Sequence, residues 1–350
     1  MNSGLELRAA VREDRDGLAG FLSETFKHPA GTFFIRPEVL DWKYFWPRSD
    51  WESPRSWIVK NEGRIVAHAG VWPLRIPSSR GIVDCLHAID WAASPEFAGA
   101  GALLFRNLTR RVPVMLALGG THHSQRVLPS LGFSPIGEAD VYARSVRPWN
   151  QFRRGPRPSA RAVARLVRRT VRSFHSKASH RGWSADAVRA FSEADLEAVS
   201  EIPGGRVAFL QPSVAMLNFV LACPGGNCRG FTLSSGGKRM GYLILSRPDG
   251  QVRVADLRIR SQEPEDWAAA YSVALDLAWE DRLCNEIMSF GSTDLAREAL
   301  AANGFQRVAS RLIRLIDGGK ILKDLPPLQL QSITTDAFFL SITSHQYYLT

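Results

Sequence analysis

One short stretch holds two features that could do chemistry: a histidine and an aspartate on a strand, and a run of small residues after it. His87 titrates near neutral pH and Asp90 carries a carboxylate, so either could take a proton from a substrate. Small residues let several backbone amides turn toward one point at a helix start, where the helix dipole adds positive potential. Such a turn can hold a pyrophosphate, although similar turns commonly serve close packing. The small residues are Ala98, Gly99, Ala100, Gly101 and Ala102.

A strand must position this stretch, and it is expected to end near Trp91, with a helix beginning near Ala102. Strand alternation puts Cys85, His87 and Ile89 on one face, while Asp90 lies on the other. A lone strand histidine is also commonly a hydrogen-bonded core residue. The sequence therefore leaves two roles open for His87, catalytic base and core residue.

The other histidines and the cysteines do not indicate a metal site. His122 and His123 are adjacent, so on a helix they point about 100 degrees apart and cannot easily bind one metal ion. No HExxH pattern accompanies them. A contact between one of them and a substrate stays open. The four cysteines show neither zinc spacing nor a disulfide framework, and we expect ordinary thiols in a reducing compartment: Cys85, Cys223, Cys228 and Cys284.

A partial internal repeat sets the domain organisation. "THHSQRVLPSLGF" (121–133) is echoed by "TDLAREALAANGF" (293–305), which indicates a duplicated module. In both copies a threonine suits a helix N-cap, and a glycine suits the left-handed residue that ends the helix. Pro129 should shorten or kink the first of these helices. A shift of 172 residues pairs Gly119 with Gly291, Thr121 with Thr293, Leu128 with Leu300, Gly132 with Gly304 and Phe133 with Phe305.

The same order of elements precedes the echo in both copies. Each begins with a hairpin, whose turn is expected at 61–63 in the first copy and at 236–237 in the second. A strand (83–93; 251–260), a helix and a further apolar strand (112–120; 285–292) follow. We therefore predict an α/β (α+β) fold of two domains, each with a mixed, mostly antiparallel central sheet flanked by helices. The predicted bounds are 1–148, a basic helical linker over 149–182, and 183–350.

The linker carries the whole formal excess of charge. Of the net +10, residues 153–182 supply nine Arg and one Lys with no acid. Val163, Val167, Val171 and Phe174 recur at helical spacing, which predicts an amphipathic helix. The helix could pack its valines on a domain, or its arginines could attract an anionic partner such as a membrane surface. Scarce aromatic residues argue against sequence-specific nucleic-acid binding. The arginines concerned are Arg161, Arg165, Arg168, Arg169 and Arg172.

No part of the sequence predicts a membrane span. No apolar run approaches about 18 residues, and the first residues, "MNSGLELRAAVREDRDG", are charged where a signal peptide needs an apolar segment. We expect a cytoplasmic protein, either free or peripheral to the inner face of the membrane.

The order of elements resembles that of the GNAT acyltransferases. In that family the motif Gln/Arg-x-x-Gly-x-Gly/Ala holds the pyrophosphate of acetyl-coenzyme A, and here "EFAGAG" (96–101) matches it, with Glu96 in place of Gln or Arg. The resemblance covers about 5–145, and 190–320 through the repeat. The second copy has "RSQEPEDWAAAYSVAL" at this position, without glycine and with several acids. The resemblance therefore implies a tandem GNAT arrangement in which only the first copy binds coenzyme.

The same resemblance suggests roles for individual residues. The strand before the loop splays open in GNAT enzymes, and its last backbone groups, here Ile89, Asp90 and Trp91, would line the thioester. Many relatives take their base from the position of Cys85, two residues before His87, which makes His87 a candidate base beside Asp90. The usual tyrosine acid is replaced by Leu128, and Ser124 or Tyr142 could substitute for it.

The function implied is acyl transfer from acetyl-coenzyme A, without a metal, to a primary amine of a small molecule or amino sugar. Two alternatives stay open: a Fem-like aminoacyl-tRNA-dependent transferase, and a coenzyme A-binding or scaffold protein without activity. An aromatic stretch could stack on a sugar or base, although packing against the core is its more common use. Its members are Phe33, Phe34, Trp42, Tyr44, Phe45 and Trp46.

Overall fold

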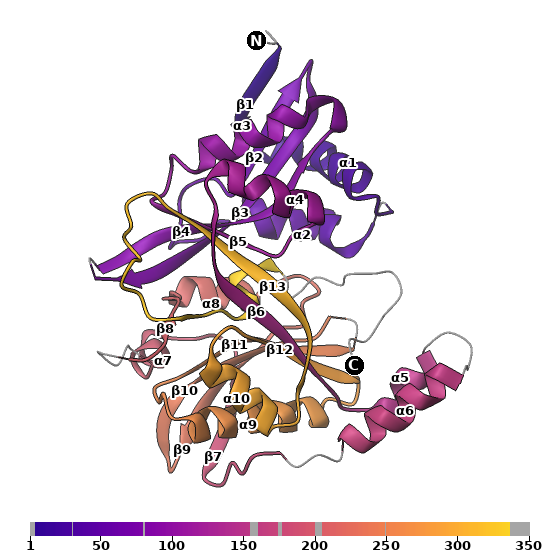
Figure 1. Cartoon of the computed structure of the whole chain (residues 1–350), viewed down its shortest axis with the longest axis vertical. Coiled ribbons are helices and arrows are strands. Elements are labelled where there is room, and N and C mark those ends of the chain that lie inside the picture. Colours follow the sequence, from indigo (N-terminus) through magenta and orange to yellow (C-terminus); the bar gives the residue numbers. More distant parts are fainter. Residues whose placement is uncertain are drawn as a thin grey trace.

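A mixed, mostly antiparallel sheet of twelve strands runs through both halves of the chain (Figure 1). The computed structural model describes residues 4–29, 31–79, 81–154, 160–173, 177–199, 205–248 and 250–336. The strand order in the sheet is β1-β2-β3-β4-β5-β13-β6-β12-β11-β10-β9-β7. The predicted sheet type with flanking helices is confirmed, with the difference that the two halves share one sheet.

The N-terminal half follows the expected order of elements. Its strands are β1 (Leu5–Ala9), β2 (Ser56–Asn61), β3 (Arg64–Ser78), β4 (Gly81–Ala93), β5 (Val114–Leu118) and β6 (Ser134–Ser145). Its helices are α1 (Arg15–Phe26), α2 (Pro37–Leu40), α3 (Ala98–Leu108) and α4 (His122–Val127). A helical hairpin of α5 (Pro148–Arg154) and α6 (Ala160–Ser173) leads to the second half.

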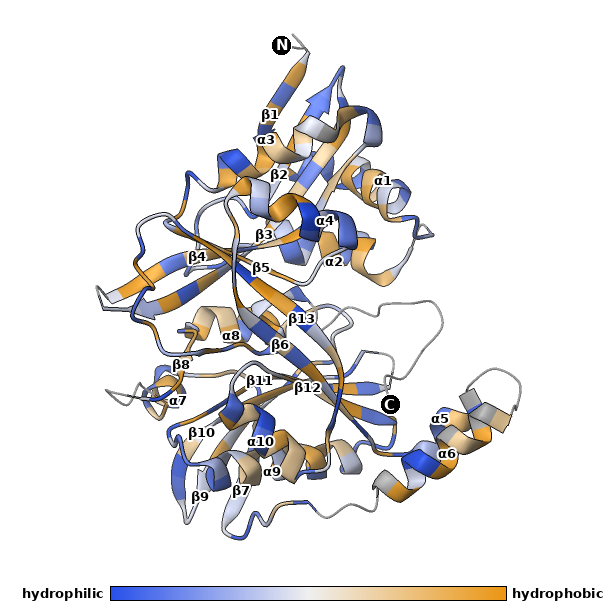
Figure 2. Cartoon of the chain, in the orientation of Figure 1, coloured by the Kyte–Doolittle hydropathy of each residue, from blue (hydrophilic) through white to orange (hydrophobic). Residues whose placement is uncertain are grey.

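The C-terminal half repeats this order and then returns to the first. Its strands are β7 (Trp183–Val188), β8 (Ala208–Phe209), β9 (Arg229–Ser235), β10 (Lys238–Ser246), β11 (Gln251–Ile259), β12 (Glu286–Gly291), β13 (Gln306–Asp317) and β14 (Leu328–Gln329). Its helices are α7 (Glu193–Glu197), α8 (Val214–Leu221), α9 (Pro264–Glu280) and α10 (Asp294–Ala302), with a last 3-10 turn at Ser332–Thr334. Hydrophobic residues occur along the strands of both halves, interspersed with hydrophilic ones (Figure 2).

The two halves exchange a strand at the centre of the sheet. β13, from the end of the chain, pairs with β5 of the first half, whereas β6 of the first half pairs with β12 of the second. β13 and β6 pair with each other and so join the two parts of the sheet. The predicted domain bounds stay a prediction, because each half is completed by a strand of the other.

Each half has one parallel strand pair that separates. β4 pairs with β5 only over Cys85–His87, and β11 pairs with β12 only over Gln251–Arg253. Beyond these residues neither pair has further ladder bonds, so the strands diverge. Each first strand also has a bulge just past this point, as the register of its other neighbour shows.

Local backbone chemistry follows the sequence prediction closely. Gly63 and the pair Gly236 and Gly237 have positive φ, at 78°, 56° and 77°, and form the two hairpin turns. The Thr121 hydroxyl accepts the Ser124 amide at 3.2 Å, as an N-cap does. Gly132 ends the first echoed helix with φ 95°, and Pro129 confines α4 to 122–127 with a 3-10 turn after it.

The linker helix does not pack its valines against either half, which was the first of the two interpretations of its sequence. Val163, Val167 and Val171 are 47%, 57% and 60% exposed, so the valine stripe faces solvent. Phe174 lies outside the described residues. Among the described residues, no helix is both long and apolar enough to cross a membrane.

Candidate active site

The bulge in β4 places Asp90 at the point where β4 leaves β5. Ile89 pairs with Gly70 and Ala92 with His68, so β4 has one residue more than β3 here. Asp90 takes the left-handed conformation, with φ 47°. Gly70 makes room for the neighbouring helix, because a Cβ there would lie 2.6 Å from the Tyr44 hydroxyl.

The Asp90 carboxylate belongs to a buried charge cluster. It accepts hydrogen bonds from Lys43 Nζ and from the Tyr44 hydroxyl, both at 2.5 Å. Lys43 Nζ also donates to Asp336 at 2.6 Å, and Lys43 is fully buried. Burial alone lowers the pKa of Lys43, but the two carboxylates outweigh it and raise that pKa. The cluster thus connects three parts of the chain: the helical turn Asp41–Phe45 that follows α2, strand β4, and Asp336, the last described residue.

The pKa values of the two carboxyl groups in this cluster are shifted in opposite directions. Burial raises the pKa of Asp90, but Lys43 and the Tyr44 hydroxyl lower it by more than burial raises it. The net shift of this pKa is therefore downward. Burial also raises the pKa of Asp336, and Lys43 offsets this only in part. Asp90 is therefore the firmly ionised member of the pair, and Asp336 is the carboxyl that takes up a proton more readily.

Two neutral histidines hold the strands around the bulge. Burial lowers the pKa of both His68 and His87 to about 4. His68 Nδ1–H donates to the Asp90 carbonyl at 2.9 Å, and the Ser56 hydroxyl lies 3.0 Å from His68 Nε2. His87 Nε2 accepts the Leu118 amide at 3.2 Å. His87 thus bridges β4 and β5 where their ladder has ended.

Helix α3 begins at Ala98, four residues earlier than the sequence suggested. The small residues 98–102 therefore form its first turn instead of a loop before it. Phe97 precedes the helix and makes no side-chain capping bond, and no acid lies in the first turn. The first amides of a helix have no partner within the helix. These amides are available to an anion, and coenzyme binding at this start stays a prediction.

The glycines of α3 have different packing environments. A Cβ at Gly99 would meet nothing within 4 Å, so the backbone is open to approach at this position. A Cβ at Gly101 would lie 3.1 Å from Trp91 Nε1, and the Trp91 indole donates to the Gly101 carbonyl at 3.2 Å. Trp91 also packs edge-on against Phe105, with ring centroids 4.4 Å apart. Trp91 therefore fixes the end of β4 against α3.

In the second half, the segment 328–332 lies at the corresponding gap between strands. The Ser292 hydroxyl, just after β12, donates to the Leu328 carbonyl at 2.9 Å and accepts the Leu330 amide at 2.7 Å. The Ser332 hydroxyl donates to the Val254 carbonyl of β11 at 3.0 Å. The segment 328–332 therefore bonds to β11 and to the residue that follows β12, and the chain then continues to Asp336, which contacts Lys43 of the first half.

The start of α9 is also unsuited to an anion. Its first turn contains Pro264, Glu265 and Asp266, whose carboxylates repel negative charge. The preceding Gln262 accepts the Arg206 amide at 2.6 Å. The prediction that only the first half binds coenzyme stays a prediction.

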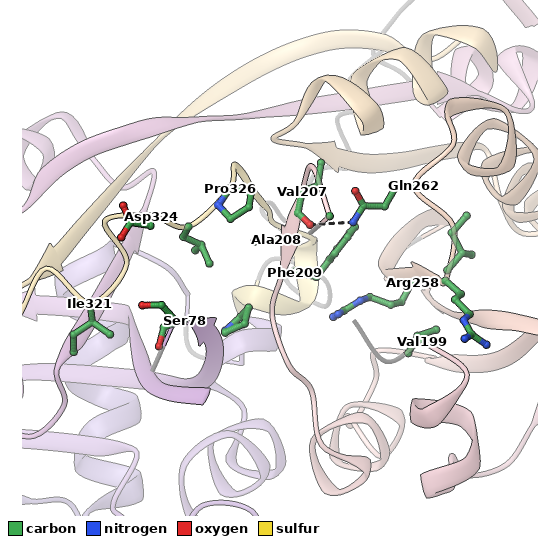
Figure 3. Close-up of a pocket in the computed structure, with 16 residues that line it drawn as sticks. Ser78, Val199, Val207, Ala208, Phe209, Arg258, Gln262, Ile321, Asp324 and Pro326 are labelled. Atoms are coloured by element: carbon green, nitrogen blue, oxygen red, sulfur yellow. Dashed lines mark hydrogen bonds between the residues drawn. The ribbon is translucent and has the colours of Figure 1, made fainter. Parts of the chain in front are cut away.

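A separate cavity of 280 Å³ lies between the halves, at the far end of β3 from the bulge (Figure 3). Its lining includes Ser78, Phe209, Gln262 and Asp324. The Arg258 guanidinium covers the Phe209 ring at 4.6 Å. From Gly70 to Ser78, β3 spans about 26 Å at roughly 3.3 Å per residue, so this cavity is remote from Asp90.

The structure distributes the predicted catalytic residues unevenly. It brings Ile89, Asp90 and Trp91 to the bulge and His87 beside it. Ser124 lies at the start of α4, with its hydroxyl 2.9 Å from that of Thr121. Tyr142 packs in the core of the C-terminal half, where β6 pairs with β12, and its side chain lies 3.2 Å from the position of a Cβ on Gly291. Strand exchange carries Tyr142 away from Asp90, which the repeat could not reveal.

Sequence reasoning missed four members of the buried cluster. These are Lys43, Tyr44 as a polar partner, His68 and Asp336. A lysine between Trp42 and Tyr44, both buried, was the available signal, because a buried lysine needs carboxylate partners. The expected core packing of the aromatic stretch holds for Phe34, Trp42 and Tyr44, whereas Trp46 is 42% exposed.

The comparisons with known proteins rest on structure alone. No protein-family model and no curated protein matches the chain. Saccharomyces cerevisiae N-myristoyltransferase with bound myristoyl-CoA is 11% identical over 91% of this chain and 83% of that one, with a TM-score of 0.60. A GCN5-related N-acetyltransferase from Anabaena variabilis is also 11% identical, over 89% and 72%, with a TM-score of 0.58.

A third solved structure covers nearly the whole of both chains. It is a putative acetyltransferase from Pyrococcus horikoshii, 11% identical over 93% of this chain and 94% of that one, with a TM-score of 0.56. The chain therefore has the fold of the GNAT superfamily, as the sequence resemblance implied.

Proposed function

We propose that the protein is an acyl-coenzyme A-dependent N-acyltransferase whose N-terminal half binds the coenzyme. One observation carries the proposal: the uncapped, acid-free start of α3 follows the β4 bulge at the point where β4 and β5 separate. In this reading the amides of 98–102 hold the pyrophosphate, and the backbone of Ile89, Asp90 and Trp91 lines the thioester. The second half has no such opening among its described residues, because segment 328–332 bonds to β11 and to Ser292 just after β12.

The reaction is a direct transfer. The amine lone pair attacks the thioester carbonyl carbon, the carbon–sulfur bond breaks, and coenzyme A leaves as a thiolate. One proton must leave the attacking nitrogen, and backbone amides can stabilise the oxyanion that forms in between. We propose acetyl as the acyl group and a primary amine of a small molecule or amino sugar as the acceptor, both on the family resemblance.

The contacts of His87 and Asp90 favour positioning over proton abstraction. His87 is neutral at pH 7, but with a pKa of about 4 it is a weak base, and its Nε2 already accepts the Leu118 amide. The Asp90 carboxylate is engaged by Lys43 and Tyr44. We infer that both residues shape the gap between β4 and β5, and that water takes the proton from the substrate.

A second candidate function is aminoacyl transfer from a charged tRNA. The observation that favours it is the basic segment 153–182 beside two halves of one fold. A coenzyme A-binding protein without activity is the third candidate, because Glu96 replaces the residue that would assist the phosphates.

One experiment separates the three candidates. Acetyl-coenzyme A is titrated by calorimetry, and thiol release is then followed across a panel of amines and amino sugars. Binding with amine-dependent thiol release is the expected result. Binding without release for any amine would leave only the inactive protein, and no binding together with transfer from aminoacyl-tRNA would replace the proposal by the second candidate.

A further inference from the structure

The α5–α6 hairpin places an apolar stripe in solvent. Val163, Val167 and Val171 repeat at intervals of four along α6 and are 47%, 57% and 60% exposed. They therefore form one continuous ridge on the helix surface. On α5, Trp149 is also 58% exposed. Figure 1 shows both helices at one edge of the molecule, in the lower right.

The opposite side of α6 faces the protein. Arg169 lines a small recess with Ala143 and Ser145 of β6, and the Arg144 guanidinium donates to the Ser173 carbonyl at 3.1 Å. A helix that only connects two halves would bury its valines and expose its arginines. In α6 the three valines are exposed instead, which leaves the apolar ridge available to something outside the chain.

Charge identifies the partner of this ridge. Residues 153–182 contain nine Arg and one Lys without a single acid, and Arg168 is exposed beside the valines. Clustered arginines bind phosphate groups through charge and paired hydrogen bonds. A nucleic acid would satisfy the arginines but offers no aliphatic surface to the valines. A bilayer with anionic headgroups satisfies both.

We propose that α6 docks the protein on an anionic lipid surface, with Val163, Val167 and Val171 entering the boundary between headgroups and acyl chains and the arginines contacting lipid phosphates. Attachment of this kind is peripheral and reversible, since the stripe is short. It is independent of whether the first half binds coenzyme A.

The test is sedimentation of the full chain with vesicles of phosphatidylcholine, with and without phosphatidylglycerol. Wild-type protein should bind only the anionic vesicles and dissociate as NaCl is raised. The variant V163N/V167N/V171N keeps the net charge and should bind about tenfold more weakly or worse. Its matched control is I82N/I136N/L283N, three aliphatic residues elsewhere that are 64%, 50% and 55% exposed. This control should bind like wild type.

A charge variant tests the second half of the proposal. R161Q/R165Q/R168Q/R172Q should lose the preference for anionic over neutral vesicles. Thermal unfolding of every variant verifies that it folds, and I82N alone replaces the triple control should that one unfold. Equal vesicle binding by wild type and the asparagine variant would overturn the proposal. So would absence of binding, tighter binding to an RNA duplex than to vesicles, or a dimer in light scattering that the asparagine variant abolishes.

Discussion

At the level of single residues, Lys43 keeps its charge because two carboxylates lie within 2.6 Å of it. Both contacts are buried, so each partner depends on the others for its solvation. Asp90 is thereby held ionised and oriented at the bulge, and Asp336 connects the end of the described chain to the same place. The cluster therefore ties the bulge to two other parts of the molecule.

Removing the lysine should therefore be costly. K43M leaves two buried carboxylates without a cation, and we expect it to lower the free energy of unfolding by about 3–5 kcal/mol. Urea denaturation at pH 7 measures this. K60M is the matched control, because Lys60 is partly exposed and its partner Asp14 keeps a second cation, Arg8, and it should cost about 1 kcal/mol or less. Equal stability of K43M and wild type would show that the cluster is not buried.

His87 should give the protein a measurable pH dependence. Its pKa of about 4 in the folded state lies below the unfolded value, so its contribution to stability is complete above pH 6.5 and is lost as the pH falls toward 4. H87Q removes the titration while a glutamine oxygen can still accept the Leu118 amide. Between pH 7 and pH 5, wild type should lose roughly 2 kcal/mol more stability than H87Q.

The comparison with H87Q isolates His87 from two other buried groups. His68 titrates in the same direction, whereas burial raises the pKa of Asp256 to about 6, which acts in the opposite sense. Parallel pH curves for wild type and H87Q would show that His87 is not buried and neutral. Turnover then separates its two roles, because a positioning residue is rescued by glutamine and a base is lost in both H87Q and H87A.

At the level of elements, the segment 328–332 explains why the second half lacks a coenzyme gap. Ser292 anchors it through one donated and one accepted hydrogen bond. S292A should cost about 1–3 kcal/mol, since it leaves the Leu330 amide without its partner. Denaturant unfolding measures this, with S130A on the exposed 3-10 turn Leu128–Leu131 as the control. No loss in S292A relative to S130A would show that the segment is not held there.

Elements defined by local chemistry could be predicted from the sequence. The hairpin turns, the threonine caps and the glycines that end the echoed helices depend on neighbours within a few residues, and all of them are observed. The bulge cluster could not be predicted, because its contacts join residues far apart in the sequence. Lys43 lies 47 residues from Asp90 and 293 residues from Asp336. The position of Tyr142 could not be predicted either, because it depends on the pairing of β6 with β12 and β13. The pattern of apolar residues does not specify which strands pair.

At the level of the whole molecule, the exchange of β6 and β13 makes the halves interdependent. A fragment of residues 1–148 lacks β13, so one edge of β5 would be unpaired and exposed. We expect this fragment to aggregate or to lack a cooperative unfolding transition. Adding the fragment 149–350 during refolding should restore soluble, folded protein. A monomeric 1–148 fragment with cooperative unfolding would contradict this interdependence.

The central claim is that one coenzyme A molecule binds per chain, at the start of α3. Calorimetric titration tests it most directly, with wild type, G99E and the control G318E, whose glycine is likewise unobstructed but remote in sequence from α3. We predict one site in wild type and in G318E, and none in G99E, where a carboxylate enters the anion site. Undiminished binding by G99E, or two sites per chain, would contradict the account.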